Sequence, residues 1–151
     1  NTTMSIFTNM TRDYEREHDH GHGPDCACDC RGHGHCLLAT MVMEDENNFL
    51  AYEWPANCRG WENPNVQKMI KSLRLDGVKI HGCEVGLESP EGKKMFKPWL
   101  IQTNCQGLID VLEGKLCKGD HEHQRCEGKY TELSGYYPQE MCRLWSLTSY
   151  I

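Results

Sequence analysis

One short run, FLAYEWP from Phe49 to Pro55, constrains the fold of this chain more than any other stretch. It begins with consecutive apolar residues and ends at Glu53-Trp54-Pro55, where proline lacks a backbone donor and forces the preceding residue into an extended conformation. This pattern predicts a buried strand with an acid and an aromatic residue at its carboxyl end. Because ligands bind outside the carboxyl ends of strands in open α/β sheets, Glu53 is a candidate ligand contact.

The segments around this strand alternate between helical and extended patterns. Asn63 and Pro64 suit an N-cap and a first helical turn, so we predict a helix over residues 64–73. Extended runs follow at 78–81 and 99–101, the second after a turn at 89–92, and this strand, helix, strand and hairpin order predicts an α/β fold. We expect further helices over 4–14, 37–42, 104–116 and 138–151. In the third of these Leu116 belongs to the buried side, and in the last Met141, Leu144 and Trp145 face inward. Together these segments form one domain, 1–151, whose β-α-β-hairpin scaffold spans 49–104.

Composition indicates that the apolar core needs support. The chain has 151 residues, a hydrophobic fraction of 38% and a mean hydropathy of -0.66, so some further cross-linking is expected. The formal net charge of -6 at pH 7 does not favour non-specific binding to phosphate backbones. Nucleic acid would have to be bound through a local basic patch or a partner. No apolar run approaches the ~18 residues of a membrane span, and the start at Asn1 indicates a mature form or a piece of a longer protein.

Ten cysteines and eight histidines are the candidate cross-links, and the sharper of their two clusters spans 117–126. It has the pattern C-x3-H-x-H-x2-C, formed by Cys117, His121, His123 and Cys126. Two thiolates and two imidazoles are donors that tetrahedral zinc prefers, and a closed set of four is structural rather than catalytic. The alternative is a disulfide between the two cysteines, with both histidines on the surface.

The other cluster, HDHGHGPDCACDCRGHGHC at 18–36, holds nine potential ligands, and its glycines predict a loop. Alternate residues of an extended segment point the same way, which places several donors on one ion. The expected zinc ligands are Cys26, Cys28, Cys30, His33, His35 and Cys36. Cys58, Cys83 or Cys105 could add a donor from the fold. The alternative is a solvated histidine-rich loop that binds metal only opportunistically.

Motifs for catalysis are missing from this sequence. It has no G-x-S-x-G, no phosphate-binding glycine loop, no H-E-x-x-H and no G-x-G-x-x-G. Glu53 has an alternative role as a surface carboxylate paired with Arg59 or Lys97. Tryptophans 54, 61 and 99 either line an aromatic pocket or complete the core. His81 lies on the polar side of its strand pattern and is expected to be an ordinary residue.

Three pieces of the chain, FLAYEWPANCRGW, HGCEVGLESPEGKKMFKPWLIQTN and CKGDHEHQRCEGKYTELSGYYP, suggest a family. Together they resemble the C-terminal part of a methyltransferase-like domain of mobile retroelement polyproteins, which is distantly similar to DNA cytosine methyltransferases. The resemblance implies a partial Rossmann-like sheet whose last strands pair at K-P-W, with 117–126 as an appended metal knuckle and Glu53 near the target-base pocket. This chain lacks the Pro-Cys nucleophile loop and the S-adenosylmethionine-binding glycine turn, which implies no independent activity.

These patterns predict an intracellular, zinc-stabilised α/β module with a binding or structural role, joined to a protein partner or a larger assembly. The first alternative is a secreted, disulfide-rich glycoprotein that carries sugars at the N-x-T sequons of Asn1 or Asn9 and binds an extracellular partner. The second is one part of a split methyltransferase, with Glu53 contributing to a shared pocket. The state of the cysteines separates the leading prediction from the first alternative.

Overall fold

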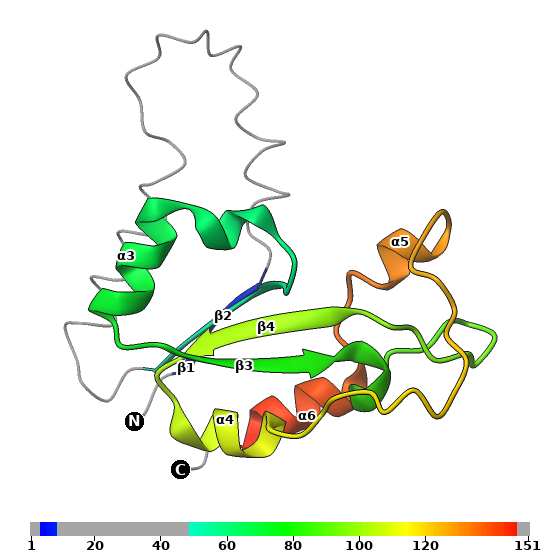
Figure 1. Cartoon of the computed structure of the whole chain (residues 1–151). Coiled ribbons are helices and arrows are strands. Elements are labelled where there is room, and N and C mark those ends of the chain that lie inside the picture. Colours follow the sequence, from blue (N-terminus) through cyan, green and yellow to red (C-terminus); the bar gives the residue numbers. More distant parts are fainter. Residues whose placement is uncertain (1–3, 9–48, 148–151) are drawn as a thin grey trace, which may run out of the picture.

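The computed structural model describes residues 4–8 and 49–147, which are built around a four-stranded sheet (Figure 1). The strands are β1 (Met4–Thr8), β2 (Phe49–Pro55), β3 (Asp76–His81) and β4 (Pro98–Thr103), in the order β1-β2-β4-β3. β1 is parallel to β2, and β4 is antiparallel to both of its neighbours. β1, β2 and β3 therefore share one direction. The predicted mixed α/β class and the strands expected after residue 49 are confirmed.

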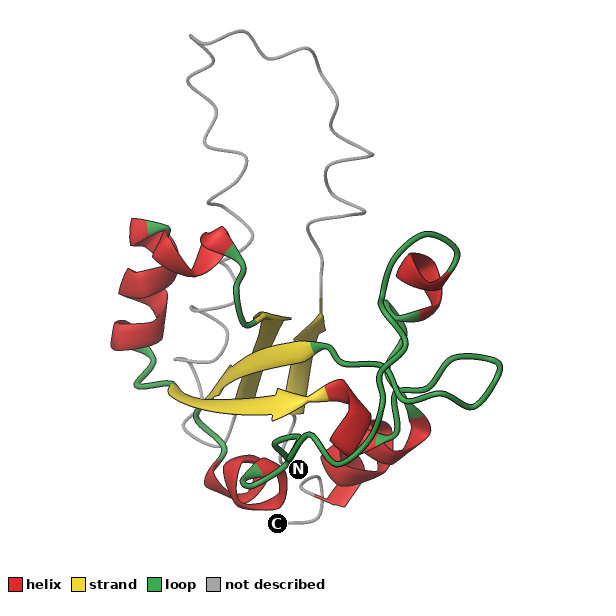
Figure 2. Cartoon of the chain, turned by 45° about the vertical axis from the view of Figure 1, so that its right-hand side comes forward, coloured by secondary structure: helices red, strands yellow, loops and turns green. Residues whose placement is uncertain are grey.

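Helices cover both faces of this sheet (Figure 2). The connection from β2 to β3 contains the 3-10 helix η1 (Arg59–Glu62) and α3 (Pro64–Ser72) on one face, while α4 (Gln106–Leu112) and α6 (Gln139–Leu147) lie on the other. Short helices η2 (Gly82–Val85) and α5 (Tyr130–Leu133) complete the described part, and neither was predicted. β2 and β3 are consecutive strands, yet β4 lies between them. β3 therefore joins the sheet only through its pairing with β4.

Two apolar cores result from the period-2 alternation of strand side chains. Leu50, Tyr52 and Trp54 of β2 pack with η1 and α3, whereas Ala51 and the β4 residues Trp99 and Ile101 face α4 and α6. Trp54 and Trp61 lie 5.3 Å apart between ring centroids, in the first core. Since Trp99 belongs to the second core, the three tryptophans complete two cores and do not line one pocket.

The helices begin and end where local signals place them. The Asn63 side chain accepts a hydrogen bond from the backbone N–H of Asn65 at 2.9 Å, which confirms the predicted cap of α3. The helix expected over 104–116 ends earlier, at Leu112, because the chain then turns through Gly114 with φ +78°. Leu116, which was expected on the buried side of that helix, is 43% exposed. In α6, the predicted inward side chains are buried: Met141, Leu144 and Trp145.

The helix expected over 4–14 is wrong where the structure describes it, because Met4–Thr8 forms β1. Its backbone pairs with β2 in register from Met4 with Phe49 to Thr8 with Glu53. This long-range pairing overrides a local periodicity that fits a helix. The rest of that segment, the expected helix at 37–42, the ligand loop at 18–36 and both sequon asparagines lie outside the described residues.

The helices of the described ranges are short. α3 and α6 have nine residues each, whereas a membrane-spanning helix needs about 20. Within these ranges, no helix combines the length and the apolar character required to cross a bilayer.

Candidate metal centre

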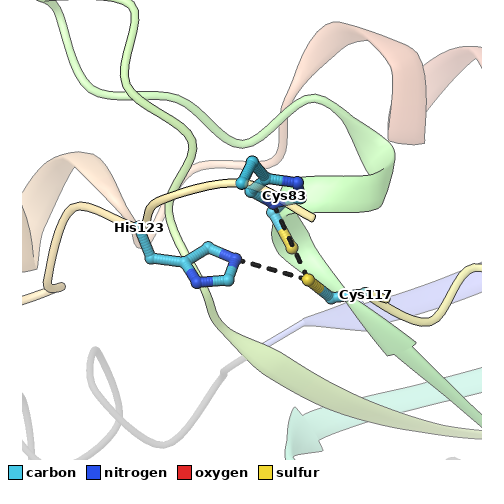
Figure 3. A group of neighbouring side chains, drawn as sticks. Cys83, Cys117 and His123 are labelled. Carbon is cyan, nitrogen blue, oxygen red and sulfur yellow. Dashed lines mark hydrogen bonds between the residues drawn. The ribbon is translucent and has the colours of Figure 1, made fainter. Parts of the chain in front are cut away.

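Four side chains that could hold a metal ion come from two distant segments and meet beyond the end of β3. Cys83 comes from η2, and Cys117, His121 and His123 come from the segment that follows α4. Their ligand atoms all lie within 4.8 Å of one another. Figure 3 shows the side chains of Cys83, Cys117 and His123 directed toward a common point. The arrangement is a Cys2His2 donor set.

The backbone around η2 fixes the position of Cys83. The N–H of Gly82 donates to the Lys97 carbonyl, and the N–H of Leu87 donates to the Gly82 carbonyl, both at 2.8 Å. Gly86 ends η2 with φ +87°, a left-handed conformation that favours glycine. The thiol of Cys83 is therefore held in a buried position, 2% exposed.

Burial, followed by the hydrogen bond with Cys117, raises the pKa of the Cys83 thiol to about 12. The free protein therefore keeps this thiol protonated at neutral pH. A bound cation reverses this preference, because metal ligation requires the thiolate and releases the proton. Metal binding at this centre is consequently expected to release protons.

The loop that carries the other three donors has the geometry of a metal knuckle. The N–H of Gly119, whose φ is +74°, donates to the Cys117 sulfur at 3.3 Å. The Nε2 atoms of His123 and His121 lie 3.4 and 3.7 Å from that sulfur. Zinc bond lengths in a tetrahedral site give ligand separations of about 3.3–3.8 Å. The observed distances fit such a shell, so these residues suit zinc.

Asp120 orients one of the two histidines. Its Oδ1 lies 2.7 Å from Nδ1 of His121, which places the ring proton on Nδ1 and leaves Nε2 for a metal. The hydrogen bond with His121 lowers the pKa of Asp120 below its usual value, so the carboxylate is charged at neutral pH. The ligand atoms of Glu84, Asp120 and His121 also lie within 4.8 Å of one another. Since both His121 nitrogens already face partners, we interpret Asp120 as an orienting group.

His81 and Phe96 form a further layer around the donors. The Nδ1 atom of His81 accepts a hydrogen bond from the N–H of Cys117 at 2.9 Å. The Phe96 ring lies 4.6 Å from the His81 ring and 5.3 Å from the His123 ring, both in edge contacts. Burial is the main cause that lowers the pKa of His81. Sequence reasoning missed this role, although the place of His81 directly before Gly82-Cys83 at a strand end was an available signal.

Three of the four donors predicted for 117–126 come together, whereas Cys126 lies outside the group. Its sulfur donates to the Phe96 carbonyl at 3.5 Å, and Cys83 completes the set. The N–H of Gln124 donates to the Lys94 carbonyl at 2.8 Å, which anchors the chain to another segment before it reaches Cys126. All six cysteines of the described ranges are free thiols: Cys58, Cys83, Cys105, Cys117, Cys126 and Cys142. The candidate ligands at 26–36 lie outside these ranges.

Glu53 is a buried acid, not the surface carboxylate of the alternative prediction. Its side chain lies in the sheet, is 5% exposed and accepts a hydrogen bond from the Tyr137 hydroxyl. Burial raises the pKa of Glu53, while the Tyr137 hydrogen bond and the charge of Lys97 oppose this shift. β2 is an inner strand, with β1 on one side and β4 on the other, so Glu53 lies within the sheet and not at its edge.

In comparisons with known proteins, no protein-family model, curated protein or solved structure matches this chain. The methyltransferase-like resemblance therefore stays a prediction. The geometry of the donor set is the firmest guide to function.

Proposed function

We propose that this chain is a zinc-stabilised α/β module with a binding or structural role. The observation that carries the proposal is the meeting of Cys83 with Cys117, His121 and His123. Four protein donors close a tetrahedral shell and leave no position for a water or a substrate. Such a site supplies folding energy and holds segments together. It has no open position for hydrolytic chemistry.

The segment that carries the knuckle gains little from the apolar cores, because Cys126 packs only partly buried against one of them. No residue between Glu113 and Lys129 is buried. A structural zinc contributes on the order of 10 kcal/mol in small metal-dependent domains at neutral pH. Zinc would therefore join this segment to the end of β3 through Cys83, and replace the missing burial of apolar surface.

The proposal includes a Rossmann-like origin, as half of a methyltransferase-like domain of a retroelement polyprotein. The shared direction of β1, β2 and β3, with α3 in the crossover from β2 to β3, supports it. The K-P-W residues lie at the start of β4, which pairs with β3 as the resemblance implies. A half domain without a nucleophile loop would act with a protein partner or in a larger assembly. A reducing, intracellular setting suits zinc-bound thiols.

A second candidate, one part of a split methyltransferase, is favoured by one observation. Glu53 lies near the carboxyl end of β2 as a buried acid with a raised pKa, and such groups cluster at functional sites. Binding of S-adenosylmethionine or of DNA by the purified chain, lost in Glu53→Gln, would support this candidate. Binding that is equal in both proteins would remove the argument from Glu53.

The test of the leading proposal is metal removal from the full chain under reducing conditions. We expect one zinc ion at this centre, and a strong chelator should lower the melting temperature and disorder the knuckle. Zinc at about 1,000 times its dissociation constant stabilises the folded state by about 4 kcal/mol, so this amount should be lost and then restored by zinc. The proposal would be refuted if the chelator left the melting temperature unchanged while a reductant unfolded the untreated protein. That result would favour the secreted, disulfide-bonded alternative. Mass spectrometry without reductant reads the thiol state directly.

A further inference from the structure

We propose that His81 is a positioning residue for the metal centre, which sets the location of Cys117 before an ion binds. This inference rests on the proposed zinc function and assigns a role to a histidine outside the donor group. His81 is the last residue of β3, two positions before Cys83. His81 therefore lies where the sheet ends and the segment with the first donor, Cys83, begins.

His81 holds the incoming segment at two points. Its backbone N–H donates to the carbonyl of Lys115 at 2.9 Å, and its Nδ1 accepts the N–H of Cys117, also at 2.9 Å. The two cysteines approach each other from positions 34 residues apart in the sequence, and no buried apolar side chain lies in the segment from 113 to 129. These two hydrogen bonds therefore fix where the Cys117 sulfur stands relative to Cys83.

The ring of His81 is itself oriented by packing. The edge contact with Phe96, at 4.6 Å between ring centroids, holds the imidazole while Nδ1 faces the amide of Cys117. An Nδ1 that accepts a hydrogen bond places the ring proton on Nε2. His81 thus acts as a neutral acceptor with one defined tautomer. His81 holds the backbone of one donor, Cys117, whereas Asp120 holds the ring of another donor, His121.

Pre-organisation of this kind strengthens metal binding without adding a ligand. Residues that orient metal ligands typically contribute about 10- to 100-fold to metal affinity. We expect the contribution of His81 to zinc affinity to lie in this range. Without its hydrogen bond, Cys117 would lie on a segment that has no buried side chain to hold it in position.

The experiment compares His81→Leu with His81→Asn in the full, reduced chain. The asparagine side-chain oxygen stands close to the position of Nδ1 and accepts the same N–H, whereas leucine has no acceptor. Zinc affinity is measured by competition with a chromophoric chelator, and Co²⁺ absorption reports the thiolate ligands. Circular dichroism of the metal-free proteins checks that each variant folds. Lys79→Leu, an exposed change on the same strand, is the matched control.

We expect His81→Leu to weaken zinc binding about 10- to 100-fold and His81→Asn to recover most of the loss. The Co²⁺ spectra of wild type and both variants should be the same, and nitrogen NMR of the wild type should show the Nε2-protonated tautomer. Wild-type affinity in His81→Leu would overturn the inference and leave the zinc proposal intact. A changed Co²⁺ spectrum would overturn it by making His81 a ligand, and an asparagine variant as weak as leucine would exclude the hydrogen bond. A wild type that binds no zinc would instead refute the proposed function.

Discussion

The sheet and the metal knuckle are two regions that reach their structures by different means. The sheet buries apolar side chains on both faces: Leu50 is 1% exposed on one face, and Ile80 and Ile101 are each 0% exposed on the other. Between residues 113 and 129 no side chain is buried, and the chain is held by backbone hydrogen bonds and by donors that converge on one point. Apolar area specifies the first region, whereas the second depends on the placement of a few polar atoms.

The largest effect that would sharpen this comparison concerns the ligand set. Cys117→Ser removes a thiolate from the centre and should weaken zinc binding more than about 100-fold, since the loss of a ligand exceeds the loss of an orienting residue. Cys126→Ser is the matched change at a half-buried cysteine outside the group and should leave the affinity within about threefold, because Cys126 is not one of the four donors. A chelator competition measures both values.

The Co²⁺ spectrum provides the control for this pair, because Cys126→Ser should keep the two-thiolate signature and Cys117→Ser should lose one thiolate. Equal losses of affinity in the two variants would mean that Cys126 also binds the ion. The donor set of 117–126 predicted from the sequence would then replace the set that includes Cys83.

The next effect tests the sheet. Ile101 lies in β4 between Glu53 of β2 and Val78 of β3 and is 0% exposed, so Ile101→Ala should lower the free energy of unfolding by about 2–5 kcal/mol. The exposed Lys79→Ala on β3 should change it by no more than about 0.5 kcal/mol. Denaturant unfolding of the zinc-loaded proteins measures both. Zinc affinity of the folded Ile101→Ala protein should stay close to that of wild type, and a large loss would show that the two regions are not separable.

The smallest effect depends on pH and concerns the acid buried in the sheet. The pKa of Glu53 in the folded protein is raised above its ordinary 4.5, so its contribution to stability is complete below that pH and declines as the pH rises through the raised pKa. Tyr137 donates to the carboxylate and opposes the shift. Tyr137→Phe should therefore cost about 1–3 kcal/mol when Glu53 is ionised, and less when it is protonated.

Chemical denaturation of wild type and Tyr137→Phe across this pH range tests the sign, and Tyr136→Phe serves as the control because Tyr136 is 66% exposed. A cost that is the same at every pH would show that the hydroxyl does not act on the ionised form of Glu53. In a Glu53→Gln background, the cost of Tyr137→Phe should no longer depend on pH.

Local patterns were sufficient for much of the sheet and its helices. The apolar run before Pro55, the Asn63-Pro64 cap and the spacing of Met141, Leu144 and Trp145 each reflect contacts within one element, and each prediction is confirmed. β1 was mistaken for a helix because its pairing partner starts 45 residues further along the chain. A pattern within one segment carries no information about such a partner.

The candidate metal centre was predictable only in part, for the same reason. Cys117, His121 and His123 are neighbours in the sequence, so their spacing indicated a shared ion. Cys83 reaches them only through the path of β3, η2 and α4, which no spacing rule describes. Cys126 has suitable spacing, but the pairing of Gln124 with Lys94 fixes the chain on a different course.

The insertion of β4 between β2 and β3 has a consequence for the order of events on the ribosome. A nascent chain that has exposed β2, α3 and β3 still lacks the strand that pairs with β2 and β3, and all four donors follow β3 in the sequence. Contacts between distant residues form late because loop closure opposes them. If the centre binds zinc as proposed, the ion can therefore be captured only after β4, which completes the sheet, has been made.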